Sequence, residues 1–135
     1  MRRRALLAAV PSLAVPLSGC SAGPPTAGVD DTGFRTTGDC RANDAATVAV
    51  DGSDVAVEGC VVGANGCADA RLAAATLDGA ALTVVVESFV PDDAEACTQA
   101  LVGRAYRATV GLDAPPESVR VVHRGVDDGT VATWP

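Results

Sequence analysis

The sequence predicts an all-β fold, an antiparallel β-sandwich of about seven strands braced by disulfides. Short runs rich in Val, Leu, Thr and Ala alternate with polar residues at the two-residue period of a strand. Asp-Gly pairs separate several of these runs, as in tight hairpins. Four cysteines in the same region are an even number, which suits the crosslinking of a small exported domain.

The first predicted hairpin joins residues 47–50 to a strand that starts at residue 55 and continues to residue 62. The connecting sequence Asp51-Gly52-Ser53-Asp54 is a strong local hairpin signal. Gly59 lies inside the second strand and is a candidate β-bulge. Residues 64–66, Ala-Asn-Gly, then predict a turn.

Residues 68–77 are rich in alanine, which favours a helix by intrinsic propensity. They nevertheless lead into Asp78-Gly79 and the alternating residues 82–87, which together indicate a second hairpin. We therefore expect a strand of small side chains. Residues 91–95 predict an acidic loop, and residues 94–101 one short helical turn around Cys97.

Three further strands are expected near the C-terminus, at residues 106–112, 119–124 and 131–134. The series of short strands joined by turn signals is immunoglobulin-like in architecture. The Cys…Trp…Cys arrangement of antibody domains is absent from the sequence, so this expectation concerns architecture alone.

The four cysteines at positions 40, 60, 67 and 97 allow three disulfide pairings. Pairing Cys40 with Cys60 and Cys67 with Cys97 is favoured, and the other two pairings stay open. Each favoured bridge closes a loop of about 20 to 30 residues and contributes roughly 3 kcal/mol on the chain-entropy model. No close cysteine pair and only one histidine are present, so we expect no metal and no cofactor.

The N-terminus has the parts of an export signal: three arginines at residues 2–4, an apolar run over residues 5–17, and then small residues. The apolar run is shorter than the roughly 20 residues that a membrane-spanning helix needs. Leu17-Ser18-Gly19-Cys20 resembles a lipobox, the lipidation signal of prokaryotic lipoproteins. The resemblance implies cleavage before Cys20 and a lipid on its thiol.

This assignment divides the chain into three parts. Residues 1–19 form a signal peptide, residues 20–35 a Gly/Pro-rich lipid-anchored tether, and residues 36–135 the sandwich domain. Arg3-Arg4-Ala5-Leu6-Leu7 also resembles a twin-arginine export signal, the alternative being an ordinary positive leader. The expected location is the outer face of the cytoplasmic membrane.

The chain carries a formal charge of −7, and removal of the three leader arginines leaves −10. Such an acidic surface argues against nucleic-acid binding, which requires a basic patch. It also argues against electrostatic adhesion to anionic lipid, so attachment depends on the lipid at Cys20. The acidic excess, without lysine or isoleucine, resembles the proteins of halophilic archaea. The mature domain is similar to their small lipoproteins of unassigned activity; a GC-rich bacterium is the alternative.

No catalytic residues are assigned from the sequence. His123 is the only candidate base near neutral pH, and a strand histidine on the rim of the sandwich is the simpler expectation. The acidic groups at residues 92–95 and 127–128 could hold Ca²⁺, but neither has the spacing of an EF-hand loop. Four arginines could line one anion-binding surface or pair with nearby acids: Arg104, Arg107, Arg120 and Arg124.

The expected function is that of a lipid-anchored cell-surface module with a binding or structural role. Its partners would be the membrane, through Cys20, and a surface protein or a glycan. The alternative is an extracytoplasmic enzyme, or an enzyme accessory or inhibitor, that uses His123 or the acidic loops.

Overall fold

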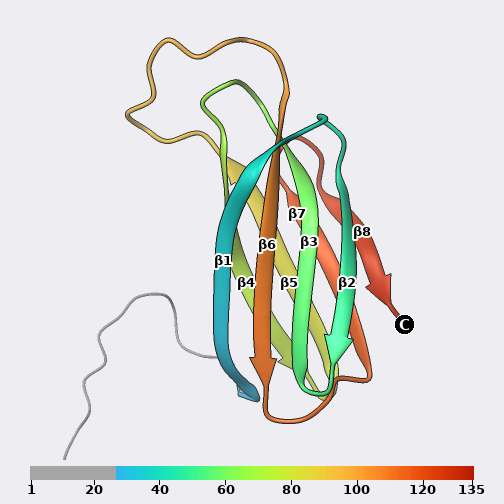
Figure 1. Ribbon diagram of the computed structural model, residues 1–135. Helices are drawn as coiled ribbons and strands as arrows, with labels where there is room; N and C mark the ends of the chain where they lie inside the picture. Colours follow the sequence, from blue (N-terminus) through green and yellow to red (C-terminus); the bar gives the residue numbers. More distant parts are fainter. Residues whose placement is uncertain (1–26) are drawn as a thin grey trace, which may run out of the picture.

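Two four-stranded sheets pack face to face in the computed structural model, which describes residues 27–135 (Figure 1). One sheet has the strand order β1-β6-β3-β2 and the other the order β4-β5-β7-β8. The strands are β1 (Val29–Cys40), β2 (Ala45–Asp51), β3 (Asp54–Gly63), β4 (Asp69–Asp78), β5 (Ala81–Phe89), β6 (Val102–Leu112), β7 (Ser118–Arg124) and β8 (Gly129–Trp134). The predicted sandwich is confirmed, with eight strands. The expected signal peptide and the expected lipidation site at Cys20 lie outside the described residues.

Strand β1 corrects the prediction that residues 20–35 form a tether, because the chain is already a strand from Val29 onward. Its residues are mostly exposed, and their Gly, Thr and Asp content hides the strand in the sequence. The strand pairs antiparallel with β6 over nearly its whole length, and its inward-facing Phe34 packs against the core. Pairing with a neighbouring strand thus outweighs the low strand propensity of the segment.

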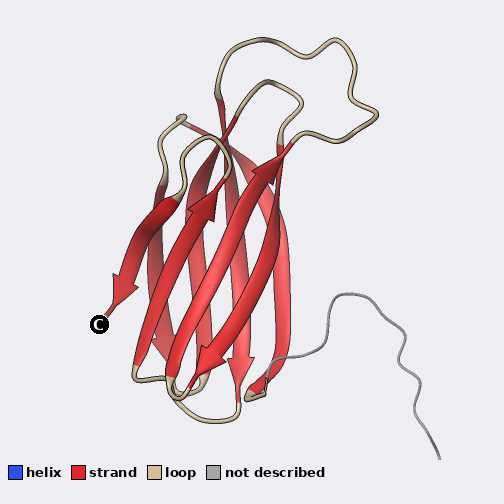
Figure 2. Ribbon diagram, turned by 180° about the vertical axis from the view of Figure 1, so that it is seen from behind, coloured by secondary structure: helices blue, strands red, loops and turns tan. Residues whose placement is uncertain are grey.

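The turns and loops gather at the two ends of the sandwich (Figure 2). The N-terminal pole holds the start of β1, the turns at residues 52–53 and 79–80, and the loop 113–117. The loop pole, at the opposite end, holds four connections. These are residues 41–44, 64–68, 90–101 and 125–128.

One strand pair is parallel, although the sequence predicts an antiparallel sandwich. Strand β5 pairs with β7, and Val84 lies opposite Val121. Between these two strands the chain crosses to the other sheet, runs back along β6, and returns through residues 113–117. Because one full strand intervenes, β7 runs in the same direction as β5.

Both predicted hairpins are present, with two-residue loops that begin at Gly52 and Gly79. Each of these glycines has a φ of 64°, the left-handed region that L side chains avoid. The predicted bulge at Gly59 is wrong, since β2 and β3 pair in continuous register from Ala45↔Cys60 to Asp51↔Asp54. Gly59 instead makes room for Tyr106, whose hydroxyl would clash with a Cβ at this position.

The core between the sheets consists mainly of valine. The side chain of His123 is also buried there. The alternating residues of β6 and β7 face inward, as their sequence pattern predicts. The alanine-rich residues 69–78 form β4, as expected. Across the described range, no helix is long and apolar enough to cross a membrane.

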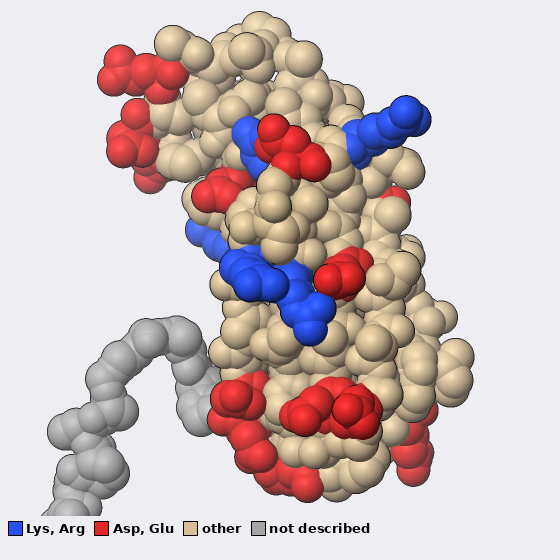
Figure 3. All heavy atoms as spheres, viewed as in Figure 1, with Lys and Arg blue, Asp and Glu red and all other residues tan. Residues whose placement is uncertain are grey.

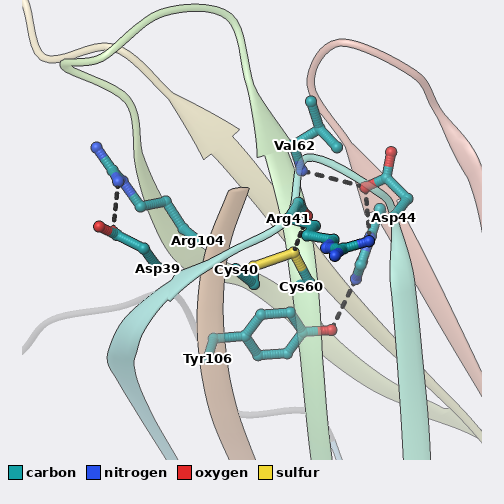
Figure 4. Close-up of a disulfide and its surroundings, with 9 residues drawn as sticks. Asp39, Cys40, Arg41, Asp44, Cys60, Val62, Arg104 and Tyr106 are labelled. Atoms are coloured by element: carbon teal, nitrogen blue, oxygen red, sulfur yellow. Dashed lines mark hydrogen bonds and ion pairs between the residues drawn. A yellow bond between two sulfur atoms is a disulfide. The ribbon is translucent and has the colours of Figure 1, made fainter. Parts of the chain in front are cut away.

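The connection from β1 to β2 crosses the loop pole from one edge of its sheet to the opposite edge (Figure 1). It passes closely over Gly103 of β6: a Cβ there would lie 2.5 Å from the Cys40 carbonyl oxygen and 2.6 Å from that of Arg41. The Cys40–Cys60 disulfide fastens the start of this crossover to β3 (Figure 4). The crossover therefore depends both on a glycine beneath it and on a covalent bond.

A second disulfide, Cys67–Cys97, joins the two largest loops of the loop pole, so the structure contains the favoured pairing. A backbone hydrogen bond from Gly66 N to Thr98 O, at 3.1 Å, lies beside it. The helical turn expected over residues 94–101 is not formed, and these residues make an irregular loop. The disulfide and the Gly66–Thr98 hydrogen bond hold this loop against residues 64–68 in place of helical structure.

We predict that Gly103→Ala destabilises the fold, because the new methyl group meets backbone atoms of the crossover that cannot turn aside. The expected loss in free energy of unfolding is about 1–3 kcal/mol, measured by chemical denaturation. Gly129→Ala is the matched control, since a Cβ there has no atom within 4 Å. Equal stability of the two variants would contradict the close crossing.

Candidate functional site

His123 lies between the sheets and connects three parts of the chain by hydrogen bonds. Its partners Asp44 and Tyr106 are labelled in Figure 4. Its Nε2 is 2.7 Å from the hydroxyl oxygen of Tyr106, on the opposite sheet. Its Nδ1 is 2.9 Å from Oδ1 of Asp44, the last residue of the crossover. The same Asp44 oxygen accepts a hydrogen bond from the backbone N of Val62, at 3.3 Å. We call Asp44, His123 and Tyr106 the buried triad.

The chemistry of the partners fixes the direction of each hydrogen bond. A carboxylate only accepts, so His123 Nδ1 carries the proton and donates to Asp44. In the neutral imidazole Nε2 is then the acceptor, and it accepts from the Tyr106 hydroxyl. The neutral Nδ1–H tautomer thus provides a partner for both ring nitrogens of His123 and for the Tyr106 hydroxyl. No buried side-chain nitrogen or oxygen among residues 27–135 lacks a partner.

Burial shifts the pKa values of His123 and Tyr106 in opposite directions. It lowers the pKa of His123 below its usual 6.5, because desolvation disfavours the imidazolium and outweighs the opposing hydrogen bond and charge of Asp44. Burial also raises the pKa of Tyr106 above its usual value, with a smaller contribution from the charge of Asp44. Both side chains are therefore neutral at pH 7.

The expectation that His123 sits on the rim of the sandwich is wrong, since its side chain is only 1% exposed. Tyr106 is equally buried, and its ring stacks on Phe34 with centroids 5.5 Å apart. Both ring nitrogens are engaged in internal hydrogen bonds, and the side chain is almost fully buried, so in this conformation neither nitrogen is presented to a substrate. The triad instead joins the crossover to both sheets.

Sequence reasoning singled out His123 but missed its two partners. The alternating patterns of residues 106–112 and 119–124 place Tyr106 and His123 on inward faces, so their burial was readable from strand periodicity. Asp44 carried no such signal, because it follows an irregular segment. Its role arises only from the path of the crossover.

The four arginines considered as one surface do not form one. Arg120 and Arg124 lie on β7, whereas Arg104 and Arg107 lie on β6 of the other sheet. Arg104 binds the Asp39 carboxylate at 2.7 Å and donates to the carbonyl oxygens of Gly66 and Ala68, which fastens the loop pole. Arg107 pairs with Glu58 at 3.0 Å.

The acidic loops that were considered for Ca²⁺ are exposed and lie on different connections. Asp128 caps its own turn by accepting a hydrogen bond from Gly125 N. At the N-terminal pole, a hydrogen bond from the protonated form of Asp30 to the Asp113 carboxylate, together with the charge of Asp113, raises the pKa of Asp30. Within residues 27–135, no group of three or more His, Cys, Asp or Glu side chains is placed to hold a metal ion.

Two shallow hollows open at the surface. One, of about 230 Å³, lies at the loop pole between the end of β5 and residues 125–126, and it includes the exposed side chains of Val90 and Val126. The other, of about 290 Å³, lies over Gly33, Arg35, Arg107 and Thr109 on neighbouring strands β1 and β6. The second hollow combines two cationic side chains with a hydroxyl group.

Comparison with known proteins adds no identification: no protein-family model, no curated protein and no solved structure matches this chain.

We predict that the free energy of unfolding falls as the pH drops below about 6.5. The reason is that His123 binds a proton more readily in the unfolded chain than in the folded chain, where its pKa is lowered. The stabilising effect is fully present above pH 6.5 and decreases by at most about 1.4 kcal/mol per pH unit, down to the lowered folded pKa. Chemical denaturation between pH 7.5 and 5 measures this slope.

His123 is the only histidine, and carboxylates titrate mainly below this range, so His123 dominates the slope. The raised pKa of Asp30 acts in the opposite direction and is common to wild type and control. The control is His123→Gln, which should remove the slope. A wild-type stability that stays flat, or rises with acid, would contradict burial of a neutral imidazole.

Proposed function

We propose that the chain is a lipid-anchored extracytoplasmic module with a binding role, attached to the membrane through Cys20. The supporting observation is that the start of the described chain and the crosslinked loops lie at opposite ends of the sandwich. Strand β1 begins at the N-terminal pole, and the crosslinked loops lie at the loop pole (Figure 1). An anchor at Cys20, nine residues before Val29, would attach the protein at the N-terminal pole and leave the crosslinked loops at the end far from the membrane.

The disulfides support export. Four of the five cysteines pair with one another, which leaves Cys20 as the single cysteine without a disulfide partner within the chain. Structural disulfides are typical of oxidising, extracytoplasmic compartments. The Cys20 thiol is not part of these two disulfides and directly follows the expected export signal, which fits covalent lipidation of this residue.

The charge distribution favours a lipid over electrostatic attachment. Acidic side chains gather near the N-terminal pole (Figure 3), among them Asp30, Asp31, Asp54 and Asp113. This pole would face the membrane in the anchored protein, and anionic lipid would repel it. Attachment would therefore need the hydrophobic contribution of a lipid chain, about 0.8 kcal/mol per buried CH₂.

The binding role is favoured over catalysis by the state of His123, the one base suited to neutral pH. Its ring nitrogens are engaged within the buried triad. The exposed surface instead offers flat strand faces, two hollows and a crosslinked pair of loops. Such features suit recognition of a ligand or of another surface molecule.

We predict that Cys20→Ser abolishes lipid attachment and shifts the leader-free protein from the membrane to the soluble fraction. The change removes the thiol that would carry the lipid and leaves both disulfides intact. Fractionation, with intact mass of the purified chain, measures both effects. An unmodified Cys20 in the wild-type protein, or a leader-free Cys20→Ser chain that stays with the membrane, would overturn the anchor.

A further inference from the structure

The outer face of the sheet β1-β6-β3-β2 carries three successive rows of different chemistry. Across β1, β6 and β3, the first row is Arg35, Arg107 and Glu58, which lie opposite one another in register. The second row is Gly33, Thr109 and Ala56. The third is Asp31, Gly111 and Asp54. All three rows point outward, because the residues between them in each strand face the core.

Figure 3 shows these rows in the same order on the front face: basic side chains at mid-height, an uncharged band below them, and acidic side chains near the lower end. The middle row has only small side chains or none, so it forms a flat shelf between the two charged rows. Alternate residues of a strand lie roughly 7 Å apart, which places the charged rows about 13 Å from each other. The hollow of about 290 Å³ opens over the upper part of the shelf.

The arginine row has guanidinium N–H groups that are not used in ion pairs within residues 27–135. Arg107 uses one nitrogen for Glu58, and Arg35 makes no ion pair with any residue of the range 27–135. The two guanidinium groups belong to directly opposed residues, a placement that disfavours the free protein through like-charge repulsion. An anion bound between them would relieve this repulsion and accept several charge-assisted hydrogen bonds.

The acidic row provides the complementary chemistry at the other side of the shelf. The Asp31 carboxylate lies over Gly111, where a Cβ would clash with it, and Asp54 Oδ1 is 3.8 Å from the same Cβ position. These carboxylates accept hydrogen bonds and repel a second anion. Thr109 adds a hydroxyl beside Gly33. The face therefore suits a ligand with an anionic group at one end and hydroxyl donors at the other.

We propose that this face binds an acidic saccharide, whose carboxylate or sulfate lies between Arg35 and Arg107. The ring that bears this group would rest on the shelf at Gly33 and Thr109. Because the charged rows lie about 13 Å apart, more than one ring spans, hydroxyls of the next sugar unit would donate to Asp31 and Asp54. An acidic peptide fits less well, because it has no row of hydroxyl donors to satisfy these carboxylates. The inference deepens the binding role proposed above and does not depend on the lipid anchor.

The test is an NMR titration of the purified exported protein with glucuronate and with glucose 6-sulfate, at fixed salt concentration. At least one of these probes should shift the amide signals of Gly33 and Thr109 at millimolar concentration, and uncharged glucose should bind more weakly. Arg35→Gln should weaken binding about 10-fold or more, the effect of losing a charge-assisted hydrogen bond. It should leave the melting temperature unchanged or raise it, because it removes like-charge repulsion.

Arg120→Gln is the matched control, since this arginine is exposed on the other sheet. It should bind the probe as the wild type does. The site is overturned if neither probe shifts these amides, or if both arginine variants weaken binding equally, which would indicate unspecific attraction. Binding of N-acetylglutamate amide as tight as that of the acidic sugars would overturn the saccharide as ligand. Fractionation of Cys20→Ser tests the anchor separately, so the two failures are distinguishable.

Discussion

The structure depends on the crossing of the chain from β1 to β2 over the loop pole. This short segment runs from one edge of its sheet to the other and is held at both ends. The Cys40–Cys60 disulfide fixes its start, and the hydrogen bond between Asp44 and His123 fixes its end. Through His123 and Tyr106 the crossover is tied to both sheets. A valine core packs well but is weakly directional, whereas this set of hydrogen bonds admits one arrangement of the three parts.

The two poles and the outer sheet face differ in their interactions. Disulfides, Arg104 and the buried triad stabilise the loop pole, and the N-terminal pole is acidic and lies beside the start of the described chain. The outer face of the sheet β1-β6-β3-β2 carries the proposed saccharide site. The only histidine of the protein is used for structure, so the proposed binding function rests on arginine, aspartate and backbone shape.

Much of the fold was predictable from local sequence signals. The glycines at positions 52 and 79 mark the two hairpins, and alternation identifies β6 and β7. Long-range effects could not be predicted. Strand β1 exists because β6 pairs with it, and Gly59 is explained by Tyr106, which is distant in the sequence. Likewise, Arg35 was assigned to a tether, so its place opposite Arg107 was hidden until β1 was known. Composition indicated a crosslinked domain but contained nothing about the crossover.

The most direct test of this account is the ¹⁵N NMR spectrum of the single histidine in the folded protein. We expect the neutral Nδ1–H tautomer at pH 7, because Nδ1 donates to Asp44 and Nε2 accepts from Tyr106. We also expect no titration near the usual pKa of 6.5, since burial lowers the pKa of His123. An Nε2–H tautomer, or an imidazole that titrates as freely as in a peptide, would contradict the buried triad and with it the proposed anchoring of the crossover.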